Sequence, residues 1–403
     1  MNFKKIKNRV PVLSKSIEFN KLQGGEFILS NQKHKHYLKI NQKTYDLLCL
    51  IDGKRNIFQI QKLFHDKHKI EIELHQIENL LYKKLCKYGV LVGDEADIKP
   101  YKKPNYLKIS FIIFNEKLVG KVVKNFRFLF HRKFAFVVIF VCLLILSLLS
   151  IKNFDAYKTF NLQESIIYFF IIMALSVTFH EFGHASSAYY FGAKHGGIGG
   201  GFYLFSPVYF ADVTDIWRLN KWQRIVVNLS GMYFELIFCT LVALIGFLIE
   251  NYTITILSIT VCVFTLFNLN PFMRSDGYWI VSDLINKPNL FRHSLDKLKD
   301  VYRTIYGERV RWSKEDIVLF IYGLTSYILI CLFLYYVLFT MPNSILKFPV
   351  NVIGFIKSLF DKNQEISLIK YTELVIPFIF YYLSFNLIIN GLKKLKNNTV
   401  FSS

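Results

Sequence analysis

The sequence predicts a mainly α-helical protein that crosses a membrane several times and carries a small α+β domain near its N-terminus. Hydrophobic residues make up 53% of the 403 residues, and many of them lie in long uninterrupted runs. The run FAFVVIFVCLLILSLLSI, residues 134–151, has close to the ~20 residues that a helix needs to cross a hydrocarbon core of about 30 Å. Basic residues are concentrated before this run, which indicates a separate domain outside the bilayer.

We predict six membrane-spanning helices from the apolar runs, at about residues 134–151, 164–193, 222–250, 254–272, 317–341 and 370–392. Cytosolic loops of membrane proteins carry an excess of Lys and Arg. If the basic N-terminal domain is cytosolic, six spans also place the loop near 194–221, the basic segment 273–316 and the C-terminal tail inside. Three lysines in the outer stretch 342–369 fit this less well. We expect both termini to lie in the cytosol.

The net charge of +21 comes mostly from the first third of the chain, where residues 1–133 carry 28 Lys or Arg and 12 Asp or Glu. Such a basic surface can bind nucleic acid or an anionic lipid surface, where each basic residue near the bilayer gains about 1 kcal/mol. The chain enters the membrane directly afterwards, so we favour the lipid surface and expect no nucleic-acid partner. The six cysteines show no paired spacing that would indicate disulfides or a cysteine-based zinc site.

The first 103 residues predict a small winged-helix-like domain. GEFILSNQKHKHYLKINQ indicates a hairpin, and NQKTYDLLCLID indicates a short helix. NIFQIQKLFHDK and ELHQIENLLYKKLCKYG have apolar residues at the spacing of amphipathic helices, and GVLVGD predicts a closing strand. A basic juxtamembrane segment, 104–133, then leads to a membrane domain, 134–403, whose core we place at about 164–290.

A cluster of polar residues interrupts the second apolar run at HEFGH. His180 and His184 are four residues apart, so on a helix both imidazoles lie on one face and can bind one metal ion such as Zn²⁺. Glu181 can then act as the base for a water molecule that the metal activates. The pattern also occurs by chance in soluble helices, but a charge at mid-bilayer costs at least about 2.5–3.5 kcal/mol, which favours a metal site here.

The stretch FNLNPFMRSDGYW, residues 267–279, offers a third ligand at the inner end of the fourth span. Asn270-Pro271 ends the helix, and Asp276 follows within the turn Ser-Asp-Gly. An ordinary helix-end turn is the alternative interpretation. His180 lies 14 residues after Ile166, about 21 Å along a helix, and so on the cytosolic side of the membrane. The predicted topology therefore places Asp276 and the two histidines at the same depth.

The two motifs together resemble the site-2 protease family of intramembrane zinc metalloproteases. Over residues 165–290, FSPVYFADVTDIWRLNKWQRIVVNLSGMYFELI and FNLNPFMRSDGYWIVSDLINKPNL also resemble bacterial membrane proteins described as peptide zinc metalloproteases. The resemblance implies that His180, His184 and Asp276 bind zinc and that Glu181 is the catalytic base. It also implies a bacterial cytoplasmic membrane as the location.

One position departs from the family pattern. Many site-2 proteases have Gly-x-x-x-Asn in the middle helix, and the resemblance implies that its Asn helps to polarise the scissile carbonyl. Here the pattern ends in Glu235, four residues after Gly231, and an ionised glutamate cannot donate a hydrogen bond. Glu235 can instead pair with a cation or be held neutral by burial. The candidates for contact with the substrate or oxyanion are therefore Asn270, Glu235 and Asn228.

The glycine-rich loop after the first motif predicts a hairpin near the site. FYLF and PVYFADV have the pattern of strands, and an open strand edge can bind an extended peptide substrate. A hairpin that only shields the site is the alternative. We expect His195, in the same loop, to be a loop residue rather than a ligand.

The N-terminal domain is similar, over residues 25–95, to the small winged-helix domains of the pyrroloquinoline-quinone chaperone type, which bind leader peptides of ribosomally made, modified peptides. The similarity implies that a leader adds as a strand to the hairpin; a structural or DNA-related role is the alternative. We therefore expect an endopeptidase that cleaves such a precursor during maturation or export. The alternatives are cleavage of a membrane-anchored regulator, and an inactive relative that serves in peptide export or immunity.

Overall fold

The structure is a computed structural model of the 403-residue chain, and the chain forms two compact units, Met1–Asn286 and Lys287–Ser403. The residues that the structure describes are 8–21, 25–93, 98, 108–160, 165–203, 206–287, 289–309, 312–340, 342–360 and a few positions between 374 and 385. The predicted domain boundary at residue 103 lies outside them.

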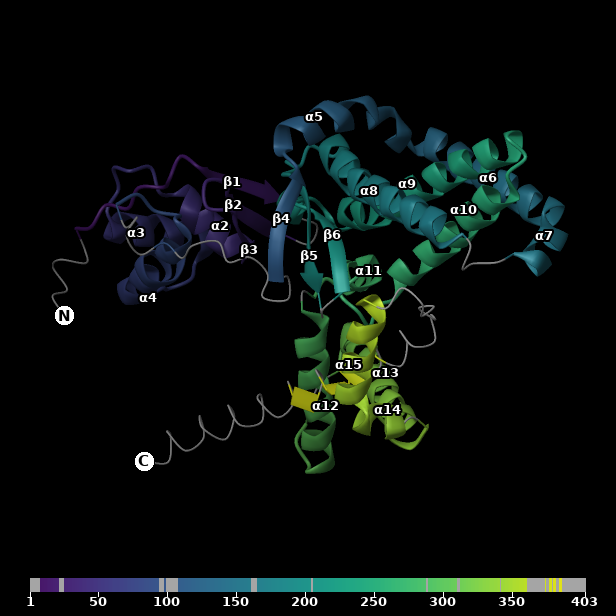
Figure 1. The fold of residues 1–403 in the computed structure, drawn as a ribbon. Coiled ribbons are helices and arrows are strands. Elements are labelled where there is room, and N and C mark those ends of the chain that lie inside the picture. Colours follow the sequence, from purple (N-terminus) through teal and green to yellow (C-terminus); the bar gives the residue numbers. More distant parts are fainter. Residues whose placement is uncertain are drawn as a thin grey trace. The chain divides into compact units, whose positions relative to one another are not determined.

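The first unit begins with a three-stranded antiparallel sheet of order β1-β2-β3, packed against short helices (Figure 1). Phe27 and Leu29 of the central strand pack with Leu48, Ile60 and Leu81 in one buried apolar cluster. The elements are β1 (Ile17–Lys21), β2 (Glu26–Asn31), β3 (His36–Asn41), α2 (Gln42–Cys49), α3 (Ile57–His68) and α4 (Leu74–Glu78), which continues as a π-helix, Asn79–Leu85, and a 3-10 turn, Cys86–Tyr88.

This domain confirms the predicted hairpin and helices but corrects two details. Strand β1 was not predicted, and it pairs with β2 along its whole length. The expected strand GVLVGD is wrong, because in this stretch only Leu91 forms an isolated bridge, to Leu13. Gly89 and Gly93 both adopt positive φ, at 68° and 104°. The chain therefore turns at both ends of a three-residue extended stretch.

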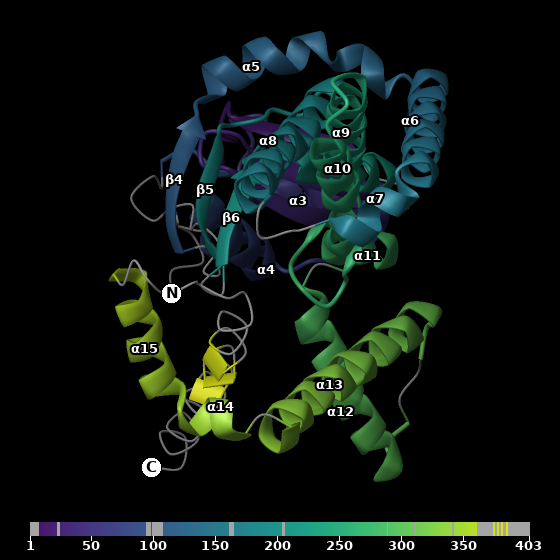
Figure 2. The ribbon, with the colours of Figure 1, turned by 45° about the vertical axis from the view of Figure 1, so that its right-hand side comes forward.

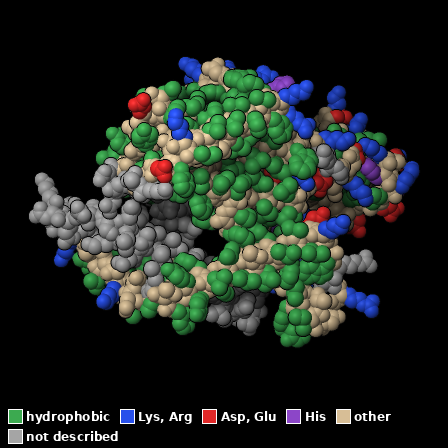
Figure 3. Space-filling model, turned by 90° about the vertical axis from the view of Figure 1, so that its right-hand side faces the viewer, with side chains coloured by type: hydrophobic (Ala, Val, Ile, Leu, Met, Phe, Trp, Pro, Cys, Tyr) green, Lys and Arg blue, Asp and Glu red, His purple; other side chains and the backbone are tan. Residues whose placement is uncertain are grey.

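Five helices in the described residues are long and apolar enough to cross a membrane. Their bounds lie within about three residues of the predicted ones, and the predicted sixth span, 370–392, falls largely outside the residues described. The upper part of the molecule in Figure 3 shows a face covered mainly by hydrophobic side chains. The spans are α6 (Arg132–Lys152), α8 (Ile166–Tyr190), α9 (Lys221–Leu248), α10 with its 3-10 extension (Tyr252–Leu269) and α13 (Lys314–Thr340).

A second antiparallel sheet, of order β4-β5-β6, lies beside the helices. It confirms the predicted hairpin, as β5 (Ile198–Tyr203) and β6 (Ser206–Ala211), but β5 begins within the glycines, four residues before the predicted FYLF strand. The third strand, β4 (Lys108–Phe114), and the following helix α5 (Glu116–Asn125) come from the segment that we expected only to approach the membrane. A side chain at Gly199 would overlap the Phe111 carbonyl, so the glycines of β5 allow β4 to pair closely.

The two central spans, α8 and α9, approach each other closely because glycines lie between them (Figure 2). A Cβ at Gly183 of α8 would overlap the Ser230 carbonyl oxygen of α9, and a Cβ at Gly231 would lie 2.5 Å from the His180 ring. Strand β6 contacts α8, and a short helix, α11 (Asp276–Ile285), packs against α9. The HEFGH segment is therefore enclosed by α9, β6 and the start of α11.

The second unit is helical in its described part. Its amphipathic helix α12 (Leu290–Ile305) packs against the span α13, with the Phe291 and Tyr322 rings 5.8 Å apart. Two further helices follow, α14 (Pro342–Leu346) and α15 (Phe348–Phe360).

Candidate metal centre

The two histidines of HEFGH point to the same place from consecutive turns of α8. His180 and His184 are both buried, with 6% and 7% exposure, and their Nε2 atoms lie 3.0 Å apart. The close contact with α9 leaves the rings little room to turn, since Gly231 lies directly against the His180 ring. The structure thus confirms the shared helical face on which the sequence prediction depends.

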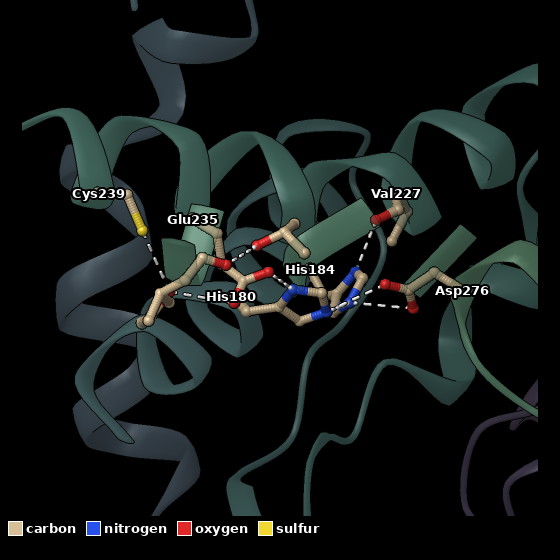
Figure 4. Close-up of polar contacts among 9 residues, drawn as sticks. His180, His184, Val227, Glu235, Cys239 and Asp276 are labelled. Atoms are coloured by element: carbon tan, nitrogen blue, oxygen red, sulfur yellow. Dashed lines mark hydrogen bonds and ion pairs between the residues drawn. The ribbon is translucent and has the colours of Figure 1, made fainter. Parts of the chain in front are cut away.

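Asp276 reaches the same place from another element. It is the first residue of α11, after the turn at Asn270-Pro271, and its carboxylate faces both imidazoles (Figure 4). Its Oδ2 lies 3.0 Å from Nε2 of His180, and its Oδ1 lies 3.4 Å from Nε2 of His184. Asp276, which follows the two histidines by more than 90 positions in the sequence, therefore converges with them, as the predicted depth of the two motifs required.

Hydrogen bonds on the far side of each ring fix which nitrogen carries a proton. Nδ1 of His184 lies 2.7 Å from the carbonyl oxygen of Val227, which can only accept, so this nitrogen must donate. Nδ1 of His180 lies 2.9 Å from Oε2 of Glu235, and an ionised carboxylate there can only accept, so this nitrogen then donates as well. With the neutral rings protonated on Nδ1, both Nε2 atoms present a lone pair.

This arrangement fits a bound cation. Two Nε2 atoms and a carboxylate face one another, and one cation between them would satisfy all three. Asp276 Oδ2 is buried and receives no well-aligned hydrogen bond from the described residues. In a tetrahedral zinc site with bonds of about 2.0–2.1 Å, ligand atoms lie about 3.3 Å apart, which is close to the observed 3.0–3.4 Å. The donor set, two imidazoles and a carboxylate, suits Zn²⁺.

Glu181 lies beside this donor set. It is buried, with 7% exposure, and potential ligand atoms of His180, Glu181 and His184 all lie within 4.8 Å of one another. The backbone N–H of Ala211, the last residue of β6, lies close to its carboxylate. The end of the hairpin is therefore next to Glu181.

The other predicted site residues serve different contacts. Oδ1 of Asn270 accepts from the Phe272 N–H at 2.9 Å, which stabilises the turn before Asp276. Nδ2 of Asn228 donates to Asp283 at 3.2 Å, so this amide is directed toward α11. His195 bonds to the Gly196 carbonyl within the loop, at 3.1 Å. Neither Asn228 nor Asn270 has a hydrogen bond to the metal-ligand candidates among the described contacts, and their roles toward a substrate stay predictions.

Sequence reasoning missed the contact between Glu235 and His180. Glu235 was a candidate for the substrate, yet its carboxylate lies against a ring of the proposed ligand set. The available signal was its spacing, because Gly231 and Glu235 are one turn apart on α9 and therefore share a face. The sequence alone did not show that this face meets HEFGH.

The N-terminal domain contacts the loop that follows β6. Lys35 lies 2.7 Å from Asp212, and the Tyr37 hydroxyl donates to Asp215 at 2.9 Å. Burial tends to raise the pKa of Asp212, but the hydrogen bonds and charge of Lys35 outweigh it and hold this pKa below its usual value. Burial and the neighbouring Asp215 carboxylate raise the pKa of Tyr37. The β2–β3 hairpin therefore contacts the segment that follows Ala211. Ala211 itself lies close to Glu181.

Part of the chain is similar to a protein that is named as a zinc metalloprotease. The chain is 26% identical over 207 residues to the Bacillus subtilis protein named "Putative peptide zinc metalloprotease protein YydH", a match that covers 48% of this chain and 79% of that protein. No family model matches, and no solved structure matches. Over about half of its length, the chain is thus similar to a protein named as a peptide zinc metalloprotease, and its buried His-Glu-His group suits zinc.

Proposed function

We propose that this protein is a zinc-dependent membrane endopeptidase whose ligands are His180, His184 and Asp276 and whose catalytic base is Glu181. The convergence of two Nε2 lone pairs and the Asp276 carboxylate supports this most strongly. Because the two histidines belong to an apolar helix long enough to cross a membrane, hydrolysis takes place at the level of the bilayer, near its cytosolic side. The location that we propose is the bacterial cytoplasmic membrane, with both termini in the cytosol.

Each residue of the site has a separate role in the proposed hydrolysis. Bound zinc supplies Lewis-acid activation of water and of the scissile carbonyl. Glu181 takes the proton of the attacking water and passes it to the leaving amine nitrogen, so that one carboxylate serves both proton transfers. The Ala211 N–H lies close to this carboxylate, and the Val227 carbonyl keeps His184 in the required tautomer.

Strand β6 supports an extended substrate beside the site. The Asp212 N–H bonds inward to the Gly197 carbonyl of the hairpin, at 3.0 Å. Successive residues of a strand alternate in direction, so the N–H groups of Ala211 and Tyr209 face the opposite, outer edge. The N–H of Ala211 faces Glu181. At the edge near Tyr209, a peptide can add as a further strand next to the catalytic base.

The substrate class that we favour is a peptide precursor, in particular a ribosomally made, modified peptide that carries a leader. The contacts of Lys35 and Tyr37 with the loop after β6 support this choice, because they place the hairpin proposed to bind a leader next to the strand proposed to bind the cleaved segment. Cleavage of a generic membrane-anchored regulator would not need this contact.

The test compares the full-length protein with Glu181→Gln in proteoliposomes. Both are incubated with leader-carrying peptides and with single-span membrane peptides, and new N-termini are identified by mass spectrometry. Loss of the base is expected to lower cleavage by at least about 100-fold, while zinc stays bound. Products that form equally with Glu181→Gln would contradict the protease proposal, and cleavage restricted to single-span peptides would contradict the leader-guided substrate.

A further inference from the structure

Glu235 of α9 contacts the site from the side opposite the proposed metal. Its Oε2 accepts from Nδ1 of His180 at 2.9 Å, and its Oε1 accepts from the Ser176 hydroxyl at 3.1 Å (Figure 4). Ser176 is fully buried and its hydroxyl also lies 3.6 Å from the Cys239 sulfur. Glu235 itself keeps only 4% exposure. Both carboxylate oxygens are therefore used within the protein.

The same helix face also confines the ring that Glu235 contacts. Gly231 lies one turn before Glu235, and a Cβ there would lie 2.5 Å from Nε2 and 2.6 Å from Cε1 of His180. The His180 imidazole thus packs against the α9 backbone at Gly231, where no side chain intervenes, and its Nδ1 faces the Glu235 carboxylate. This geometry leaves the ring one direction in which to present its Nε2, toward Asp276 and His184.

We propose that Glu235 is a positioning residue for the metal site, which fixes the orientation and the tautomer of His180. The inference builds on the zinc site of the proposed function, and it takes the place of a role for Glu235 at the oxyanion. A carboxylate that accepts two hydrogen bonds has no proton to give to a developing oxyanion. A histidine that donates to a carboxylate is instead fixed as a metal ligand and becomes more basic at its other nitrogen.

The chemistry also explains why a charge is placed so deep in an apolar helix. An unpaired buried carboxylate is strongly unfavourable, and here it is paired with a histidine whose second nitrogen faces the proposed dication. An amide at position 235 could still accept from Nδ1, but it would carry no charge to strengthen the ligand. Gly231 and Glu235 thus act together, since one makes room for the ring and the other holds it.

The experiment measures zinc affinity of the full-length protein in detergent, by competition with a chromophoric chelator. We expect Glu235→Ala to bind zinc about 10–100-fold more weakly than the wild type. Glu235→Gln keeps an acceptor without the charge, and its affinity is expected between the two. Thr240→Ala is the matched control, because Thr240 is a buried polar residue of the same helix whose hydroxyl bonds to the Leu236 carbonyl at 2.7 Å. Its zinc affinity should be unchanged.

Thermal unfolding of the zinc-free variants separates positioning from folding. If Glu235→Ala does not fold, the nearly isosteric Glu235→Gln decides the question. Wild-type zinc affinity in a folded Glu235 variant would overturn the inference, and loss of cleavage at unchanged affinity would assign Glu235 to the substrate instead. If the affinities follow the expected order and no peptide is cleaved by the wild type, the inference holds while the proposed protease function fails.

Discussion

At the scale of single residues, the site depends on backbone and side-chain acceptors that lie behind the histidines. The Val227 carbonyl and the Glu235 carboxylate lie against the two Nδ1 atoms and so direct both Nε2 atoms toward the proposed metal. The sequence predicted His180, His184 and Asp276 because their residue types and spacing follow from the chemistry of zinc. It did not predict the acceptors, because a backbone carbonyl has no sequence signature and Glu235 contacts HEFGH only through tertiary packing.

Gly231 gives a prediction at this scale. Gly231→Ala places a methyl group 2.5 Å from Nε2 of His180, so the ring must move away from the other ligands. Overpacking of this kind costs about 1–3 kcal/mol, and the displacement is expected to weaken zinc binding by at least about 10-fold. Chelator competition measures the affinity. Gly120→Ala is the control, because a Cβ there meets only the His195 ring at an ordinary 3.5 Å. Equal affinities of the two variants would show that the ring does not depend on this contact.

At the scale of elements, the apolar helices could be predicted well and the sheet beside them only in part. Helical spans are determined by local apolar runs, whereas β4 gains its partner from β5, almost 90 residues later. The KISFIIF stretch of β4 is an apolar run without clear alternation, so it does not indicate which strand it joins. The turn signals and strand patterns after HEFGH are local, and they did predict the β5–β6 hairpin.

Strand β6 gives a prediction at this scale. Tyr209→Pro removes an N–H that faces the outer edge, and proline is tolerated on an edge strand when its missing N–H is not needed by the sheet. We expect zinc affinity to be retained and peptide cleavage to fall by about 10-fold or more, because the substrate loses a main-chain partner. Cleavage rates and zinc content of Tyr209→Pro and Tyr209→Ala are compared. Unchanged cleavage by the proline variant would exclude strand addition at this edge.

At the scale of the whole first unit, the hairpin of the N-terminal domain contacts the loop after β6, and the end of β6 lies beside Glu181. Lys35 and Tyr37 bond to Asp212 and Asp215, and the adjacent Ala211 lies close to Glu181. The sequence predicted each domain separately, from local patterns. It could not predict their contact, which depends on ion pairs and hydrogen bonds between residues about 177 positions apart.

We propose that the buried donor set binds zinc and that Glu181 is needed only for the chemistry. The zinc content of the purified full-length protein, determined by mass spectrometry of the metal after dialysis against a weak chelator, tests both points. The wild type and Glu181→Gln are expected to hold about one zinc ion per chain, whereas His184→Ala and Asp276→Ala lose it. A wild type without zinc, or an Asp276→Ala variant that retains it fully, would contradict the account.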